Sequence, residues 1–251
     1  MRQTLVAGNW KLNGSLQSVK ELISGIKAGA GEAGGTQIAV CPPFVYIPLV
    51  SELLAGSSIA WGSQDVSDQE SGAFTGEISA AMLQEFGCRY AIVGHSERRA
   101  LYAEDDEFTA RKFAAARKAG LTPILCVGET LEEREAGRTM DVVGRQVDAI
   151  LKAVSADEAV NVVIAYEPVW AIGTGKTATP EIANEAHTLI RNVIADIFGR
   201  SAADGVSILY GGSVKPENTA SLMAESEVDG VLVGGASLEP GSFAEIVKAA
   251  A

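Results

Sequence analysis

Short apolar runs rich in β-branched residues recur along the chain at fairly even intervals. They cover residues 4–10, 36–42, 58–64, 90–96, 122–129, 161–167, 206–212 and 229–235. Each run is nearly continuous in its apolar character instead of alternating with polar residues, which is typical of parallel strands covered on both faces. The pattern therefore predicts eight parallel strands.

Amphipathic segments separate these runs. In residues 15–30, the apolar side chains recur at spacings of three and four, which places them on one face of a helix. Similar patterns cover 44–55, 78–86, 104–119, 140–154, 180–198, 216–224 and 237–249. Eight strand–helix units without a Pro/Gly/Ser-rich linker predict one α/β domain over residues 1–251, a closed (β/α)8 barrel of parallel strands with outer helices. A doubly wound open sheet is the alternative, but it does not need eight such regular repeats.

Composition and charge limit the kinds of ligand. Hydrophobic residues make up 47% of the 251 residues, which is enough for a large core. The formal net charge of −12 predicts no general affinity for nucleic acid or anionic membranes, since both need clustered Lys and Arg. The long uncharged stretch 33–51 is interrupted by Pro42 and Pro43, so no membrane span is predicted. An anionic ligand has to be bound by a local site.

The cysteines indicate a reducing compartment. Cys41, Cys88 and Cys126 are odd in number, lie in apolar surroundings and show no CxxC spacing. They favour free thiols in a cytoplasmic protein over disulfides or a metal site. The N-terminal segment MRQTLVAGNWKLNG becomes polar too early for a signal peptide.

In a (β/α)8 barrel, chemistry lies where the strands end and the loops toward the helices begin. Several of these positions also have an ordinary structural interpretation: Lys11 as a solvated lysine, Ser96 as a helix cap, Glu97 as a charge near a helix N-terminus, and Glu129, which we favour as the first residue of a helix. His187 lies inside a helical pattern and is predicted to be structural. The strand ends carry Asn9, Lys11, His95, Glu97, Glu129, Glu167, Gly173, Gly211, Gly212, Ser213, Gly234 and Gly235.

The segment AYEPVWAIGTGKTAT places Glu167 at the end of an apolar strand. Desolvation at such a position predicts a raised pKa for Glu167 and a role as a general base. Two stiff ends flank a glycine-containing tip, which predicts a lid that excludes water. The alternative is a mobile surface loop beside an exposed glutamate. The lid segment comprises Pro168, Val169, Trp170, Ala171, Ile172, Gly173, Thr174, Gly175, Lys176, Thr177 and Ala178.

Two Gly-Gly pairs follow the last two predicted strands, in YGGS (210–213) and VGGAS (233–237). Consecutive glycines allow backbone N–H groups to converge on an anion, and a following helix N-terminus adds a favourable dipole. Tight turns are the structural alternative. Their position after strands seven and eight favours a phosphate site.

The motifs AGNWKLNG, CPP, GHSERR, CVGE, AYEPVWAIGTGKTAT, YGGSV and VLVGGASL occur in this order over nearly the whole chain. Together they resemble the triosephosphate isomerase family, whose fold is the TIM barrel. The resemblance implies interconversion of dihydroxyacetone phosphate and D-glyceraldehyde 3-phosphate through an enediolate, without metal or organic cofactor. Another phosphosugar barrel enzyme, such as a Schiff-base aldolase, and a non-catalytic phosphate-binding barrel remain alternatives.

The resemblance also implies residue roles. Glu167 is the expected base, His95 the electrophile, and Lys11 with Asn9 stabilises the developing negative charge, while Glu97 and Cys126 are expected to support the site. His95 is expected to be neutral, since triosephosphate isomerase is itself the standard example of a histidine whose pKa is lowered by a helix N-terminus. Ser213, Gly234, Gly235 and Gly173 are expected to hold the phosphate.

A homodimer is a further implication of the resemblance. The long polar loop 62–79 corresponds to the family's dimer loop, with Phe74, Thr75, Gly76 and Glu77 at its tip and Thr75 close to the partner's Asn9–Lys11 region. One departure is Leu101-Tyr102-Ala103-Glu104, where many members have Phe-Gly-Glu. Ala103 is expected to stiffen that turn.

Overall fold

The computed structural model describes residues 2–29, 33–152, 162–172, 174 and 177–251. Eight parallel strands form a closed barrel in sequence order, in which β1 pairs with both β2 and β8. The predicted parallel barrel is therefore confirmed, with strands shorter than the apolar runs. The strands are β1 (Leu5–Asn9), β2 (Gln37–Cys41), β3 (Ala60–Ser63), β4 (Tyr90–Val93), β5 (Thr122–Val127), β6 (Val163–Tyr166), β7 (Ser207–Tyr210) and β8 (Gly230–Val233).

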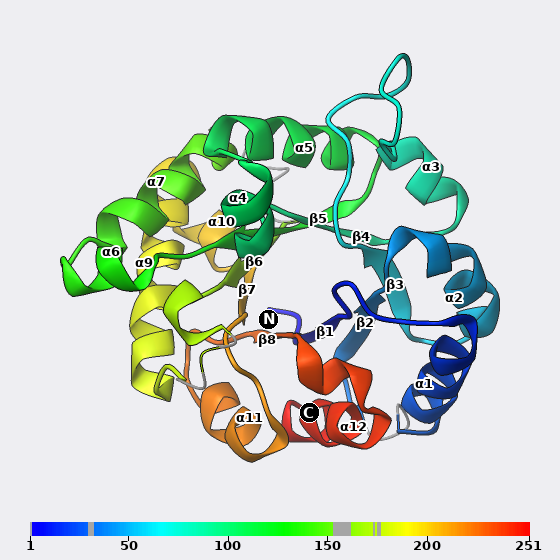
Figure 1. The fold of residues 1–251 in the computed structure, drawn as a ribbon. Coiled ribbons are helices and arrows are strands. Elements are labelled where there is room, and N and C mark those ends of the chain that lie inside the picture. Colours follow the sequence, from blue (N-terminus) through cyan, green and yellow to red (C-terminus); the bar gives the residue numbers. More distant parts are fainter. Residues whose placement is uncertain (1, 30–32, 153–161, 173, 175–176) are drawn as a thin grey trace.

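The main helices form an outer ring around the barrel (Figure 1). None of the helices in the described part of the chain combines the length and apolar character needed to cross a membrane. The main helices are α1 (Leu16–Gly29), α2 (Ile47–Leu54), α3 (Ala80–Glu85), α5 (Asp106–Lys118), α7 (Thr139–Leu151), α9 (Pro180–Phe198), α11 (Pro216–Met223) and α12 (Pro240–Ala249).

Short helical elements refine the predicted pattern. Three α-helical segments were not anticipated as separate elements: α4 (Ser96–Tyr102), α6 (Leu131–Glu135) and α10 (Arg200–Ala203). The 3-10 helices η2 (Phe44–Tyr46) and η4 (Gly235–Leu238) precede α2 and α12, and each of these α-helices has a proline in its first turn. Proline fits the first turn because the N–H that it lacks has no partner inside the helix.

Alternating strand residues divide the core into two layers. One set fills the barrel interior, including Leu5 and Ala7 of β1 and Val163 and Ala165 of β6. The other set packs against the helices, including Val6 and Ile164. Because side chains alternate along a strand, the next inward positions after Ala7 and Ala165 are Asn9 and Glu167. Strand periodicity therefore places polar groups at the interior end of the barrel.

The end of α4 contains the unusual Ala103. Its φ of 54° lies in the left-handed region, and its backbone N–H donates to the carbonyl of Arg98. A Cβ is unfavourable there, so glycine would adopt this cap with less strain. The departure from Phe-Gly-Glu thus falls at a strained position.

Candidate active site

A cavity of about 470 Å³ opens at the carboxyl ends of the strands. It brings together most of the sequence-predicted site residues, although they come from five different parts of the chain. Gly173, Gly175 and Lys176 lie outside the described residues. The predicted residues that line the cavity are Asn9, Lys11, His95, Glu97, Glu167, Ile172, Gly211, Gly212, Ser213, Gly234 and Gly235.

Glu167 is buried in the wall of this cavity, with 2% of its surface exposed. Its Oε1 lies 2.9 Å from His95 Nε2, and its Oε2 accepts a 2.9 Å hydrogen bond from the backbone N–H of Ser96. The Ser96 hydroxyl also donates to Oε1, at 3.4 Å, and the nearby Cys126 thiol favours the charged form of the carboxylate. The carboxylate is therefore held on one side of the cavity by donors from His95 and Ser96.

The N-terminus of α4 builds the histidine site. His95 is the N-cap residue, and its Nδ1 accepts from the backbone N–H of Glu97 at 3.2 Å. Our interpretation of Ser96 as the cap is wrong, because Ser96 is the first residue inside α4 and both its backbone N–H and its hydroxyl donate to Glu167. With Nδ1 as an acceptor, the ring proton of neutral His95 resides on Nε2, which faces Glu167.

The two side chains shift each other's pKa. Burial alone raises the pKa of Glu167, but His95, the Ser96 N–H and Cys126 outweigh it, so the pKa is lowered. The predicted raised pKa is therefore wrong for this arrangement, because the sequence showed the burial but not the donors. Burial likewise lowers the pKa of His95, but the Glu167 and Glu97 carboxylates reverse that shift to a raised pKa, so the lowered pKa implied by the resemblance is also wrong for this arrangement.

Lys11 is held in a strained backbone conformation. Its φ is 52°, in the left-handed region. The Lys11 N–H donates to Asn9 Oδ1 at 3.0 Å, and Gln64 Nε2 donates to the Lys11 carbonyl at 2.8 Å. Such conformations persist at functional sites because surrounding contacts fix them. Lys11 Nζ pairs with Glu97 Oε1 at 2.6 Å, so the lysine is not simply solvated.

Glycines permit the close packing behind Glu167. A Cβ at Gly128 would lie 1.7 Å from the Glu167 carbonyl oxygen, and one at Gly211 would lie 3.0 Å from Glu167 Cγ. A side chain at either position would push the carboxylate out of place. Gly128 and Gln64 could not be identified from the sequence, because their roles depend on contacts between distant segments.

The glycines after β8 serve the open side of the cavity. A Cβ at Gly235 would meet no atom within 4 Å, so the backbone there faces empty space. Ser213 follows β7 and lines the same cavity. Exposed backbone N–H groups beside a hydroxyl can bind an anion, which fits the predicted phosphate site.

Glu129 has a different role from the one we favoured. The helix α6 begins at Leu131 with a capping box between Thr130 and Glu133, so Glu129 does not begin it. Its side chain is fully buried and accepts hydrogen bonds from Tyr166 Oη at 3.0 Å and Trp170 Nε1 at 3.1 Å. Glu129 therefore anchors the lid segment to the end of β5.

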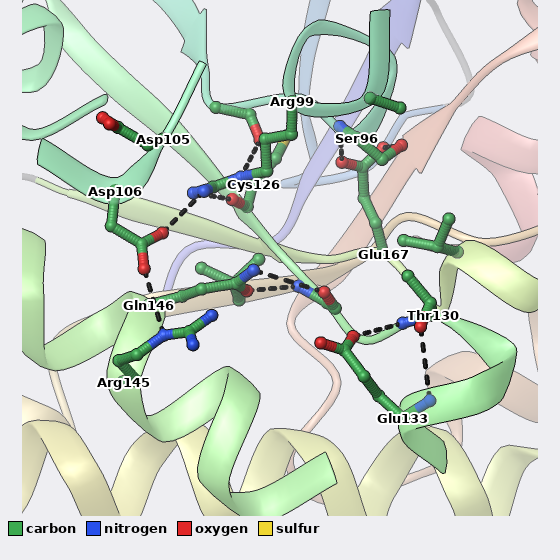
Figure 2. A pocket seen from close by; sticks show the side chains of 15 residues that line it. Ser96, Arg99, Asp105, Asp106, Cys126, Thr130, Glu133, Arg145, Gln146 and Glu167 are labelled. Carbon is green, nitrogen blue, oxygen red and sulfur yellow. Dashed lines mark hydrogen bonds and ion pairs between the residues drawn. The ribbon is translucent and has the colours of Figure 1, made fainter. Parts of the chain in front are cut away.

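A second cavity of about 360 Å³ lies behind the catalytic candidates, and Glu167 is the residue lining both cavities in the described chain. Figure 2 shows Ser96 and Glu167 on one side of it, with a chain of ion pairs from Arg99 through Asp106 to Arg145 opposite. Arg99 Nε also donates to the Gly94 carbonyl at 2.8 Å. This network fixes the turn that carries His95 and Ser96.

The predicted dimer loop extends away from the barrel between β3 and α3 (Figure 1). Its tip is a turn in which the Glu77 N–H donates to the Phe74 carbonyl at 3.1 Å, with Gly76 at a φ of 98°. Phe74 and Thr75 are exposed. Other large apolar side chains exposed on this chain include Leu12, Leu16, Val45, Met82, Phe86, Leu101 and Tyr102.

Comparison with known proteins identifies similar sequences over the full length. A family model described as Triosephosphate isomerase matches residues 4–250. The chain is 53% identical to a triosephosphate isomerase of Dechloromonas aromatica (strain RCB) over 250 residues, covering 100% of both chains. It is 55% identical to that of Thiobacillus denitrificans (strain ATCC 25259 / T1) over 251 residues, again covering 100% of both.

Proposed function

The chain belongs to the triosephosphate isomerase family and is an isomerase of dihydroxyacetone phosphate and D-glyceraldehyde 3-phosphate, and we propose that Glu167, His95, Lys11 and Asn9 carry out this reaction. The observation that supports these roles is the 2.9 Å contact between Glu167 and His95 in a cavity that also contains Lys11. A base, a proton donor and a cation thus face one enclosed space.

The reaction begins with the Glu167 carboxylate, whose lowered pKa keeps it ionised at neutral pH. It takes a proton from the carbon beside the substrate carbonyl, and the C–H electron pair forms the enediolate. To reach the substrate, the carboxylate has to leave the Ser96 N–H and His95, after which burial raises its proton affinity. Movement therefore makes Glu167 a stronger base when the substrate is present.

The same movement prepares His95. Without the nearby Glu167 carboxylate, burial favours the neutral ring. The Glu97 N–H occupies Nδ1, so Nε2–H is the available donor. It donates to the oxygen on which negative charge develops, and Lys11 adds a positive charge, as expected for stabilisation of an enediolate. The proton of the hydroxyl on the deprotonated carbon then moves to this oxygen by way of His95, which gives up its Nε2 proton and regains one. Glu167 returns its proton to the neighbouring carbon, and the carbonyl forms on the carbon that was deprotonated.

The phosphate is held by Ser213 and by the backbone of Gly234 and Gly235, which line the cavity. Gly173 remains a candidate donor from the lid. The lid segment excludes water and protects the enediolate, and Glu129 fixes its first part through Trp170. A Schiff-base aldolase is less compatible with the site, because the Glu97 carboxylate lies 2.6 Å from Lys11 Nζ and occupies the nitrogen that would have to attack the carbonyl.

Exchange with solvent deuterium tests the role of Glu167. Native protein incubated with dihydroxyacetone phosphate in D₂O is expected to form aldehyde phosphate and incorporate deuterium at one stereochemical position by NMR. Glu167→Gln removes the base and is expected to lower the rate by a factor on the order of 10³ or more, whereas Glu167→Asp retains part of it. Unchanged exchange in Glu167→Gln would assign the base elsewhere.

We also propose a homodimer of single-domain chains (residues 1–251) in the cytoplasm. The exposed apolar residues around the dimer loop support an interface, and the three buried free thiols fit a reducing compartment. Thr75→Arg places a charge at the tip of the dimer loop and is expected to yield monomers of low activity. Analytical ultracentrifugation decides this, since a fully active dimer of Thr75→Arg contradicts the proposal.

A further inference from the structure

The charged side chains that line the substrate cavity are mostly paired with one another. Lys11 pairs with Glu97 at 2.6 Å, and His95 lies 2.9 Å from Glu167. Lys215 lines the same cavity, and no carboxylate of the described residues lies within ion-pair distance of it. Lys215 therefore contributes a positive charge that the resting site does not neutralise.

We propose that Lys215 is a positioning residue that draws the substrate phosphate into the cavity and orients it toward Ser213, Gly234 and Gly235. Lys215 takes no part in proton transfer. The inference rests on the proposed function, because it assumes that the physiological ligand of this cavity carries a phosphate dianion.

The backbone of Lys215 is fixed at the edge of the phosphate site. Its N–H donates to Asn218 Oδ1 at 2.8 Å, and Asn218 Nδ2 donates to the Ser213 carbonyl at 2.9 Å. One asparagine thus ties the lysine and the serine together. The lysine is exposed, so its ammonium group can meet a ligand that arrives from solvent.

The structural role of this position does not explain a lysine. Lys215 is the N-cap residue of α11, where Ser, Thr, Asp and Asn are preferred. A cation at a helix N-terminus also interacts unfavourably with the helix dipole. A bound anion would reverse this disadvantage, because both the N-terminus and the ammonium group attract it.

The negative net charge of the chain makes a local positive charge at the cavity mouth more important for phosphate binding. A formal net charge of −12 repels a phosphate dianion at long range. Salt screens charges beyond about 8 Å at physiological ionic strength, so groups at the mouth of the cavity decide capture. An unpaired lysine there has a larger effect on association than one elsewhere on the surface.

Kinetics and phosphate binding test the proposal in the full-length protein. Lys215→Gln is expected to raise KM for dihydroxyacetone phosphate about fivefold and to weaken binding of inorganic phosphate by a similar factor, with kcat within about twofold. Lys215→Glu is expected to have a larger effect, and the difference from the native protein is expected to shrink at about 0.5 M ionic strength. Lys20→Gln, an exposed lysine on α1, is the matched control and is expected to leave all values unchanged.

Unchanged KM and phosphate affinity in both Lys215 variants would overturn the proposal, as would a loss confined to kcat. Phosphate binding by calorimetry separates this inference from the proposed function. If the native protein fails to isomerise the substrate but Lys215→Gln still weakens phosphate binding, the capture role stands and the assigned reaction fails. If Glu167→Gln abolishes isomerisation while Lys215→Gln binds phosphate normally, the assigned reaction stands and the capture role of Lys215 fails.

Discussion

The two histidines of the chain are both buried, and they have opposite protonation behaviour. His95 is 5% exposed at the start of α4, and His187 is 0% exposed within α9. Burial is the largest influence on both and lowers the pKa in each case. For His95 the carboxylates of Glu167 and Glu97 reverse the shift, whereas the pKa of His187 is lowered to about 4.

The difference lies in the partners of each ring. His187 Nδ1 lies 3.0 Å from the carbonyl of Glu227, and its Nε2 has no hydrogen-bond partner among the described residues. Nearby Arg191 further disfavours a positive ring. Its surroundings are fixed parts of the fold. His95 faces a carboxylate that the proposed mechanism moves. The pKa of a buried histidine thus depends strongly on nearby charges. A carboxylate that moves can therefore change the protonation of the ring during the reaction.

Removing each histidine in turn should give the largest contrast. His95→Gln removes the donor to the developing enediolate and is expected to reduce kcat by about 10²- to 10³-fold, with little change in the free energy of unfolding. His187→Asn, which retains an N–H donor toward Glu227, is expected to keep kcat within about twofold. Steady-state kinetics and urea unfolding measure both effects. A large loss of kcat in His187→Asn would make the second histidine part of the catalytic site.

Acid should affect the fold through His187. Its folded-state pKa of about 4 lies below its unfolded value of 6.5, so the unfolded chain binds a proton that the folded chain excludes. This contribution is fully present above pH 6.5 and is lost as the pH falls toward 4, amounting to roughly 3 kcal/mol. Urea unfolding across this range measures it. His187→Asn cannot titrate and is expected to lose less stability on acidification, and parallel curves for the two proteins would contradict the assignment.

Sequence periodicity predicted the barrel because the buried positions of each strand–helix unit form an apolar pattern within that unit's own stretch of sequence. Helix α9 matches its predicted bounds of 180–198, where Thr179 caps the first turn. The short helix α6 was missed because it has few apolar positions and is defined mainly by its capping box. Apolar periodicity therefore predicts the long helices and strands but not the short helices.

The site was predictable where a residue's position on a strand determines its direction. Asn9 and Glu167 follow inward-facing strand residues, and the structure places both in the cavity. The anchor Glu129 was not predictable, because Tyr166 and Trp170 meet it only after the barrel closes. The predicted direction of the Glu167 pKa shift was wrong for the same reason. Such contacts join segments that are far apart in the sequence, and no local sequence pattern predicts that they lie close together.

The Glu167 carboxylate is the partner that distinguishes the two histidines, so its removal is expected to make them alike. Glu167→Gln retains an acceptor for His95 Nε2–H but removes the carboxylate charge that opposes burial. The pKa of His95 is therefore expected to fall in this variant, so that His95 resembles His187. Glu97 and Lys11 remain and act in opposite directions. Glu97→Gln is the control and is expected to lower the pKa of His95 less, because the contribution of Glu97 is smaller than that of Glu167.

NMR titration of the two imidazole rings distinguishes these cases, with His187 as an internal reference. An unchanged His95 pKa in Glu167→Gln would mean that the carboxylate does not govern this ring, and the proposed coupling between movement of the base and neutrality of the histidine would then fail.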